Sequence, residues 1–211
     1  MARPGARGSS LRSTEEIRER YGLIRESLGP AVTVVAATKY VSLEEMAILV
    51  EAGVELAGEN RAQSLAAKQA TYGNAFEWHF IGHLQSRKAP LVSELCSLCH
   101  SLASESAARQ LSIPALVEVN LAGEETKSGV APERLEGFLD YCEQAGVEVC
   151  GLMTMPPLSA DPEASRPYFR RLRELAGRHG LPQLSMGTSQ DYRVAVEEGA
   201  TYVRLGSVLW T

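Results

Sequence analysis

The chain has 211 residues, 45% of them hydrophobic and 22% charged, and its formal net charge is -5 at pH 7. These proportions are typical of a folded domain, and no apolar run approaches the roughly 20 residues of a membrane-spanning helix. The acidic balance argues against a nucleic-acid-binding face, because phosphate recognition requires clustered lysines and arginines.

The first 12 residues contain three arginines, several small residues and no acid. They lack the apolar segment of a secretory signal, and we expect them to form a flexible tail. Residues 13–211 are predicted to form a single domain. This domain begins with a capping-box pattern, Ser13 and Glu16, and with helical spacing of apolar residues that ends before Gly29 and Pro30.

A strand followed by a helix is the repeating unit of the remaining chain. In the first repeat, Ser42 with Glu45 is predicted to cap a helix that ends at Gly53. Apolar and β-branched runs predict eight strands, at residues 32–38, 55–58, 77–81, 98–102, 115–120, 147–153, 184–186 and 202–205. Eight such repeats favour an α/β fold, a single closed (β/α)8 barrel of the TIM type with an extra N-terminal helix. A doubly wound open sheet is the alternative. Because the chain stops soon after strand eight, we expect the final helix to be missing or replaced by the leading helix.

The four cysteines include a C-x-x-C-H pattern at residues 96–100, which is also the pattern of covalent haem attachment. That attachment requires export, for which the chain has no signal segment. A zinc site would require a second ligand pair at suitable spacing. We therefore expect reduced, buried cysteines, no metal site and a cytoplasmic location.

Lys39 differs from the other three lysines because it ends an apolar strand. Reactive groups of such barrels lie at the C-terminal ends of the strands. An amine in that place would lose hydration, which lowers its pKa and favours a Schiff base with an aldehyde. The alternative is a lysine that extends into solvent at the barrel mouth or pairs with a carboxylate such as Glu59.

Two loops at the expected mouth of the barrel combine glycine with hydroxyl residues. Gly187 lies between Ser185 and the pair Thr188 and Ser189, and Gly206 with Ser207 follows strand eight. Phosphate commonly binds to the loops after strands seven and eight of such barrels, where backbone N–H groups and hydroxyls act as donors. Either loop alone could be an ordinary helix cap. The two loops together predict a phosphate site.

Three further polar residues are candidates for the same site. Arg204 lies inside an apolar strand, where a buried guanidinium must find acceptors. Asn60 follows strand two and could donate to a ligand oxygen or cap the next helix. His79 belongs to strand three and is a weaker candidate, beside Trp78, which we expect to fill the core.

Seven motifs in order resemble the pyridoxal phosphate homeostasis protein family, also called the proline synthase co-transcribed proteins. They are A-A-T-K at residues 36–39, G-E-N at 58–60, W-H-F-I-G-H-L-Q-S at 78–86, K-S-G at 127–129, G-L-M at 151–153, S-M-G-T-S at 185–189 and R-L-G-S at 204–207. Any one motif is ordinary, whereas the ordered set is specific. Family members often have Ser-Lys-Thr where this chain has Thr38-Lys39-Tyr40, which changes the rim and keeps the lysine.

The resemblance implies a barrel similar to the N-terminal domain of alanine racemase, with pyridoxal 5'-phosphate held as a Schiff base on Lys39. It places Arg204 opposite the pyridine nitrogen and Asn60 near the ring. The phosphate would be lined by glycines and hydroxyls, which are Ser185, Thr188, Ser189, Gly206 and Ser207.

Two functions are compatible with that cofactor. An arginine at the pyridine nitrogen keeps it unprotonated, which weakens the ring as an electron sink. Related racemases take a second base, a tyrosine, from an additional β-domain, for which this chain has no room; Tyr40 is the nearby substitute. We therefore expect an intracellular carrier or buffer of pyridoxal phosphate, which could pass the cofactor to apo-enzymes. The alternative is an amino-acid racemase or decarboxylase of low activity, and a cofactor-free aldolase acting on a sugar phosphate is a third interpretation.

Overall fold

The computed structural model describes residues 12–123 and 128–210, and its strands form one closed parallel barrel in the order β1 to β8. Closure comes from pairing of β1 with β8, where Val35 lies opposite Arg204. The open-sheet alternative is therefore wrong. The strands are β1 (Thr33–Ala37), β2 (Leu56–Glu59), β3 (Glu77–Phe80), β4 (Leu98–Leu102), β5 (Ala115–Glu118), β6 (Val149–Met153), β7 (Gln183–Thr188) and β8 (Tyr202–Leu205).

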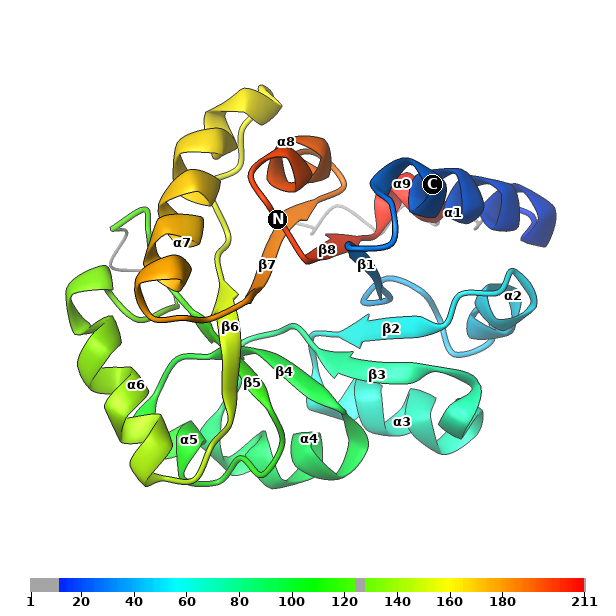
Figure 1. Cartoon of the computed structure of the whole chain (residues 1–211). Coiled ribbons are helices and arrows are strands. Elements are labelled where there is room, and N and C mark those ends of the chain that lie inside the picture. The colour runs from blue at the N-terminus through cyan, green and yellow to red at the C-terminus, as the bar shows by residue number, and fades with distance from the viewer. Residues whose placement is uncertain (1–11, 124–127, 211) are drawn as a thin grey trace, which may run out of the picture.

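Helices surround the barrel and are distributed around its outside (Figure 1). Their bounds in the described residues are α1 (Thr14–Leu28), α2 (Met46–Glu51), α3 (Ala62–Tyr72), α4 (Ala89–Leu95), α5 (Glu105–Ala108), α6 (Leu135–Gln144), α7 (Arg166–Arg178), α8 (Tyr192–Glu197) and α9 (Ser207–Trp210). Short 3-10 turns lie at Gly73–Ala75, Ser86–Lys88, Pro132–Arg134 and Pro162–Ser165. Within the described residues, no helix is both long enough and apolar enough to cross a bilayer.

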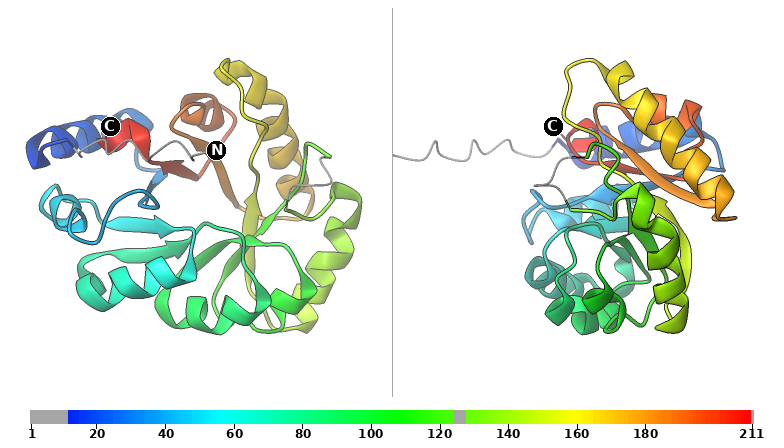
Figure 2. Two further views of the ribbon diagram at one scale, coloured as in Figure 1. Left: turned by 180° about the vertical axis from the view of Figure 1, so that it is seen from behind. Right: turned by 90° about the vertical axis from the view of Figure 1, so that its left-hand side faces the viewer.

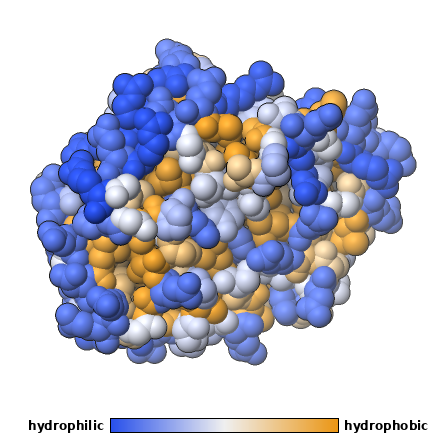
Figure 3. All heavy atoms as spheres, viewed as in Figure 1, coloured by the Kyte–Doolittle hydropathy of each residue, from blue (hydrophilic) through white to orange (hydrophobic). Residues whose placement is uncertain are grey.

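The strands are buried on both faces, which explains their continuous apolar runs. Every residue of β4 and of β5 is buried, so one face packs inside the barrel and the other packs under helices. Helix α7 shows the complementary pattern. Phe169, Leu172 and Leu175 are buried at helical spacing, while its arginines lie on the outer face. Hydrophilic residues accordingly gather over α7 and α1 in Figure 3.

Helix α1 lies outside the closed barrel, in contact with α2 and α9 (Figure 1). Ser13 and Glu16 form the predicted capping box, and Ile17, Tyr21 and Ile24 face the core. The helix lies next to α9, and Arg20 donates to the carbonyl of Val208 over 3.0 Å (Figure 2). The leading helix thus packs beside α9, the helix that follows β8.

Two predictions about the chain ends and helix starts have different outcomes. The tail at residues 1–12 stays a prediction, because residues 1–11 lie outside the described part of the chain. The helix expected after Ser42 begins only at Met46. Ser42 and Glu45 nevertheless exchange reciprocal hydrogen bonds of 2.8 and 3.2 Å, so the predicted cap exists as a turn before the helix.

The four cysteines are free thiols, as expected. Cys96, Cys99 and Cys142 are buried and Cys150 is half-buried. Burial raises the pKa of Cys96 to about 12 and that of Cys99 to about 11. Because the thiolate is the reactive form of cysteine and a raised pKa disfavours it, these cysteines have a structural role in the core.

Candidate functional site

Lys39 lies two residues beyond β1, at the mouth formed by the C-terminal ends of the strands. Its side chain is exposed, and Nζ lies 4.9 Å from the centroid of the Tyr40 ring. The prediction that the Lys39 amine loses hydration is therefore wrong, because the strand ends at Ala37 and Lys39 lies on the exposed rim of the barrel mouth. The amine is accessible to a ligand that enters the mouth.

The carboxylate suggested as an alternative partner of Lys39 is paired elsewhere. Glu59 is fully buried, and its Oε1 lies 2.5 Å from Nζ of Lys68. Lys68 also donates to the carbonyl of Thr38 over 2.8 Å, and the Thr38 hydroxyl donates to Glu59 over 2.7 Å. This buried cluster holds the backbone immediately before Lys39.

Lys68 is a residue that sequence reasoning missed. It follows Ala62 and Leu65 at a spacing of three, so all three lie on the buried face of α3. A lysine on the apolar stripe of a helix is the signal that could have revealed it, because buried lysines require a partner.

Arg204 projects from β8 into the barrel and is almost completely buried. It donates to the hydroxyl of Ser185, to the carbonyl of Thr154 over 3.1 Å and to Sδ of Met155 over 3.7 Å. Burial lowers its pKa to about 10, so the guanidinium remains charged at neutral pH. These contacts use three of its five N–H groups, and the others can face a ligand.

Ser185 lies inside the barrel beside Arg204, apart from the loop hydroxyls with which it was grouped. Its Oγ is 2.8 Å from Nδ1 of His100, and Nε2 of His100 is 2.9 Å from Nδ1 of His79. Nε2 of His79 reaches Glu77 over 3.2 Å. Both ring nitrogens of His79 are thus occupied, which argues against a direct contact with a cofactor.

The loops after β7 and β8 are joined by one hydroxyl. Oγ of Ser189 accepts hydrogen bonds from the backbone N–H groups of Gly206 and Val208, over 3.0 and 3.3 Å. Thr188 donates through its backbone N–H and its hydroxyl to Asp191, over 2.7 and 3.1 Å. The structure therefore brings both predicted loops together at one side of the mouth.

Gly187 has the backbone conformation for which glycine was predicted. Its φ is +90°, and an added Cβ would lie 2.6 Å from Cβ of Ala195 and 2.9 Å from Cα of Tyr192. Glycine allows α8 to approach the end of β7. Ser207 is exposed in the next loop, where α9 begins.

Asn60 does not cap a helix. Arg61 occupies the cap position of α3, and no side chain accepts a hydrogen bond there. The half-buried side chain of Asn60 follows β2, beside Gly82, whose added Cβ would lie only 2.1 Å from the Asn60 carbonyl oxygen. The helix-cap alternative is wrong, and the amide remains a candidate donor.

A cavity of about 250 Å³ lies on the opposite side of the mouth, above β3 to β6. Burial raises the pKa of Glu118 there, and its Oε1 accepts a hydrogen bond of 2.7 Å from Ser128. Met155, which contacts Arg204, also lines this cavity. Sequence reasoning did not single out Glu118, although a carboxylate that ends an apolar strand was visible. Lys127 of the K-S-G motif lies outside the described residues.

Comparison with known proteins identifies the family. The model of the alanine racemase N-terminal domain matches residues 13–211. A protein of Aquifex aeolicus named pyridoxal phosphate homeostasis protein is 42% identical over 191 residues, covering 82% of this chain and 84% of that protein. The chain belongs to the pyridoxal phosphate homeostasis protein family. The resemblance based on motifs is thereby confirmed.

Solved structures agree with this assignment and with the predicted barrel. PipY of Synechococcus elongatus PCC7942, solved with PLP bound, is 32% identical to this chain with a TM-score of 0.82. The match covers 92% of this chain and all of PipY. Lysine/ornithine decarboxylase of Vibrio vulnificus has a TM-score of 0.71 at 13% identity, over 96% of this chain and 65% of that enzyme, so it shares the fold alone.

Proposed function

We propose that this protein binds pyridoxal 5'-phosphate, carries it on Lys39 and acts in intracellular homeostasis of the cofactor. One observation carries the proposal. The accessible amine of Lys39 lies at the same end of the barrel as the buried, charged Arg204 and as the two hydroxyl-bearing loops that Ser189 joins. Membership of the family supports it, as does the bound PLP of PipY.

The chemistry of the donors at the mouth fits this cofactor. Arg204 has only N–H donors, so a ring nitrogen that faces it must be an acceptor, that is, an unprotonated pyridine nitrogen. Asn60 donates its backbone N–H to Glu59 over 3.3 Å, and its side-chain amide makes no hydrogen bond among the described residues. Ser189, whose oxygen accepts from the Gly206 N–H and so keeps its hydrogen to donate, and Ser207 would supply hydroxyl donors for a phosphate.

The cofactor supplies an aldehyde that condenses with primary amines and a ring that withdraws electrons. Lys39 supplies the amine. Arg204 keeps the ring nitrogen unprotonated, which opposes electron withdrawal into the ring. The residues at the mouth thus favour holding the cofactor over driving carbanion chemistry.

The racemase alternative needs acid and base groups on opposite faces of a substrate. Tyr40 was its candidate second base, but its side chain is 85% exposed and lies against Lys39 at the same strand end. This placement favours the carrier. Recipients of the cofactor would be apo-enzymes, and the free cysteines support a location in the reducing cytoplasm.

The test of binding is the visible absorption spectrum of the purified protein during titration with pyridoxal phosphate. We expect a new band for the wild type and none for Lys39→Ala. Borohydride treatment followed by peptide mass spectrometry should place the reduced adduct on Lys39. A wild type that gives no band and no adduct would show the proposal to be wrong.

A second experiment separates a carrier from an enzyme. The loaded protein is mixed with a pyridoxal-phosphate-dependent apo-enzyme, and recovery of that enzyme's activity is followed against an equal concentration of free cofactor. Racemisation and decarboxylation of amino acids are measured in parallel. Turnover far above that of free pyridoxal phosphate would contradict the carrier function.

A further inference from the structure

Five side chains form a continuous line through the interior of the barrel. Arg204 of β8 donates to Ser185 of β7, which contacts His100 of β4 over 2.8 Å. His100 contacts His79 of β3 over 2.9 Å, and His79 contacts Glu77 at the start of β3 over 3.2 Å. The line therefore begins at the candidate site and ends at the opposite end of the barrel.

The chemistry of its first member sets the direction of every hydrogen bond. Arg204 can only donate, so Ser185 accepts from it and keeps one hydroxyl hydrogen to donate. The described contacts offer this hydrogen one acceptor, Nδ1 of His100. A neutral His100 then carries its proton on Nε2 and donates to Nδ1 of His79. His79 in turn donates from Nε2 to the carboxylate of Glu77, which can accept.

If the hydrogen bonds ran in the opposite direction, two buried polar groups would lack a suitable partner. If Nδ1 of His100 donated to Ser185, the fully buried Ser185 hydroxyl would have no acceptor. Nε2 of His79 would then direct a lone pair at the Glu77 carboxylate. Each conflict costs free energy, because a buried polar group without a partner is not compensated by water. Burial also lowers the pKa of His79 and of His100, which keeps both rings neutral.

We propose that Ser185, His100 and His79 are positioning residues that hold Arg204 in place through a one-way hydrogen-bond relay ending at Glu77. The relay draws the Ser185 hydrogen toward His100, which leaves its oxygen lone pairs for Arg204. This inference rests on the proposed function, since Arg204 is the residue that would face the cofactor ring.

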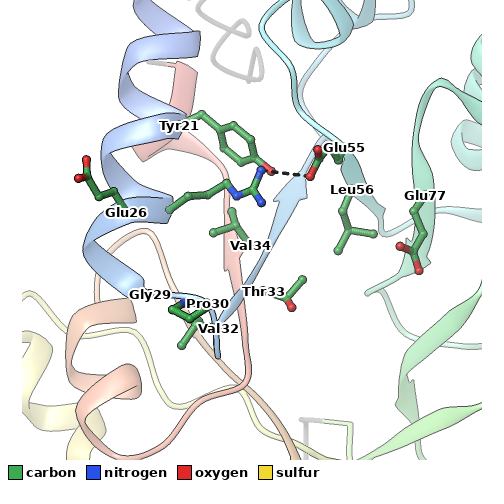
Figure 4. A pocket seen from close by; sticks show the side chains of 11 residues that line it. Tyr21, Glu26, Gly29, Pro30, Val32, Thr33, Val34, Glu55, Leu56 and Glu77 are labelled. Carbon is green, nitrogen blue, oxygen red and sulfur yellow. Dashed lines mark hydrogen bonds and ion pairs between the residues drawn. The ribbon is translucent and has the colours of Figure 1, made fainter.

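The far end of the relay is accessible to a surface mutation. The side chain of Glu77 is 59% exposed and lines a pocket between α1 and the barrel (Figure 4). Glu55 lines the same pocket, and its side chain is 73% exposed and pairs with Arg25 (Figure 4). Its backbone carbonyl accepts a hydrogen bond of 2.8 Å from the Glu77 N–H, but its side chain makes no described hydrogen bond to the relay. The two glutamates form a matched pair for comparison.

The first experiment determines the histidine tautomers by ¹⁵N NMR of the ring nitrogens in the cofactor-free protein. We expect both histidines to carry the proton on Nε2. In Glu77→Gln the new amide can donate as well as accept, which removes one of the two conflicts, so the fraction of His100 with its proton on Nδ1 should rise, while Ser185 keeps the Nε2 tautomer the major form. Glu55→Gln should leave His100 unchanged. Protonation of His100 on Nδ1 in the wild type, or an equal response to both variants, would overturn the relay.

The second experiment asks whether the relay positions Arg204. Ser185→Ala removes the acceptor of Arg204, and we expect roughly tenfold weaker binding of pyridoxal phosphate together with a shifted visible band. Cys99→Ala is the control, because it also removes one buried atom, next to His100 and outside the relay. Unchanged affinity and spectrum in Ser185→Ala would overturn the positioning role.

The two experiments also separate this inference from the proposed function. The tautomers are read without cofactor, so they test the relay even if the wild type proves not to bind pyridoxal phosphate. Normal cofactor binding together with histidine tautomers other than the expected Nε2 forms would contradict the relay and would not affect the proposed function.

Discussion

The buried ion pair between Lys68 and Glu59 connects the end of the second strand to the helix that follows it. Thr38 links it to the segment that bears Lys39. Buried pairs of this kind are weak evidence for net stability, but removal of one partner leaves an uncompensated charge. The pair therefore holds the Lys39 segment in place rather than adding a large net stabilisation.

Lys68→Met should lower the free energy of unfolding by roughly 3–5 kcal/mol, because the Glu59 carboxylate would remain buried without its partner. Urea denaturation measures this loss. The double variant Lys68→Met with Glu59→Gln removes both charges and should recover part of it. A change within about 0.5 kcal/mol for the single variant would contradict the role of the pair.

Arg204 is the second residue on which a prediction depends. Arg204→Lys keeps the charge but loses the planar fork that reaches Ser185 and the Thr154 carbonyl together. We expect binding of pyridoxal phosphate to weaken by about tenfold or more, since at least one hydrogen bond to a charged donor is lost. Titration followed by visible absorption checks this. Wild-type affinity would show that charge alone is sufficient.

At the scale of elements, the loop from β7 to α8 depends on close packing of backbone. The sequence motif already indicated glycine at position 187, and its φ of +90° explains why. The same motif also suggested that Ser185 belongs to the phosphate loop. Its place in the barrel interior depends on where β7 ends, and strand ends are the least predictable part of an element.

Gly187→Ala should destabilise the protein by about 1–3 kcal/mol or more, because alanine would be strained at this φ and would clash with α8. Thermal and urea unfolding both measure the loss. Gly137→Ala is the matched control: it lies inside α6, has ordinary φ and has no atom within 4 Å of the added Cβ. That control should be neutral or slightly stabilising. Equal effects of both substitutions would contradict the packing argument.

For the whole molecule, the two buried histidines couple stability to pH. Burial lowers the pKa of His79 and His100 below the ordinary value of 6.5, so the unfolded chain binds more protons than the folded chain below that pH. Their contribution is fully present above pH 6.5 and is lost as the pH falls toward the lowered values. Glu77 and Arg204, at the two ends of the relay, carry opposite charges. The raised pKa of Glu118 contributes to the pH dependence of stability in the opposite sense from the two histidines.

Urea unfolding on both sides of pH 6.5 should therefore show stability falling on the acid side, by at most about 1.4 kcal/mol per pH unit for each histidine. His100→Gln should reduce this slope by removing one of the two groups. A flat profile in the wild type would contradict the buried, neutral state of these rings.

The sequence by itself determined the order of strands and helices, the barrel and the position of Lys39 at a strand end, because these depend on local periodicity and on motif spacing. Only the tertiary structure decided which polar side chains meet. Arg204 reaches a serine 19 residues away, and that serine reaches a histidine 85 residues away. Those contacts exist because closure of the barrel brings distant strands to face one another, and no local pattern in the chain records that geometry.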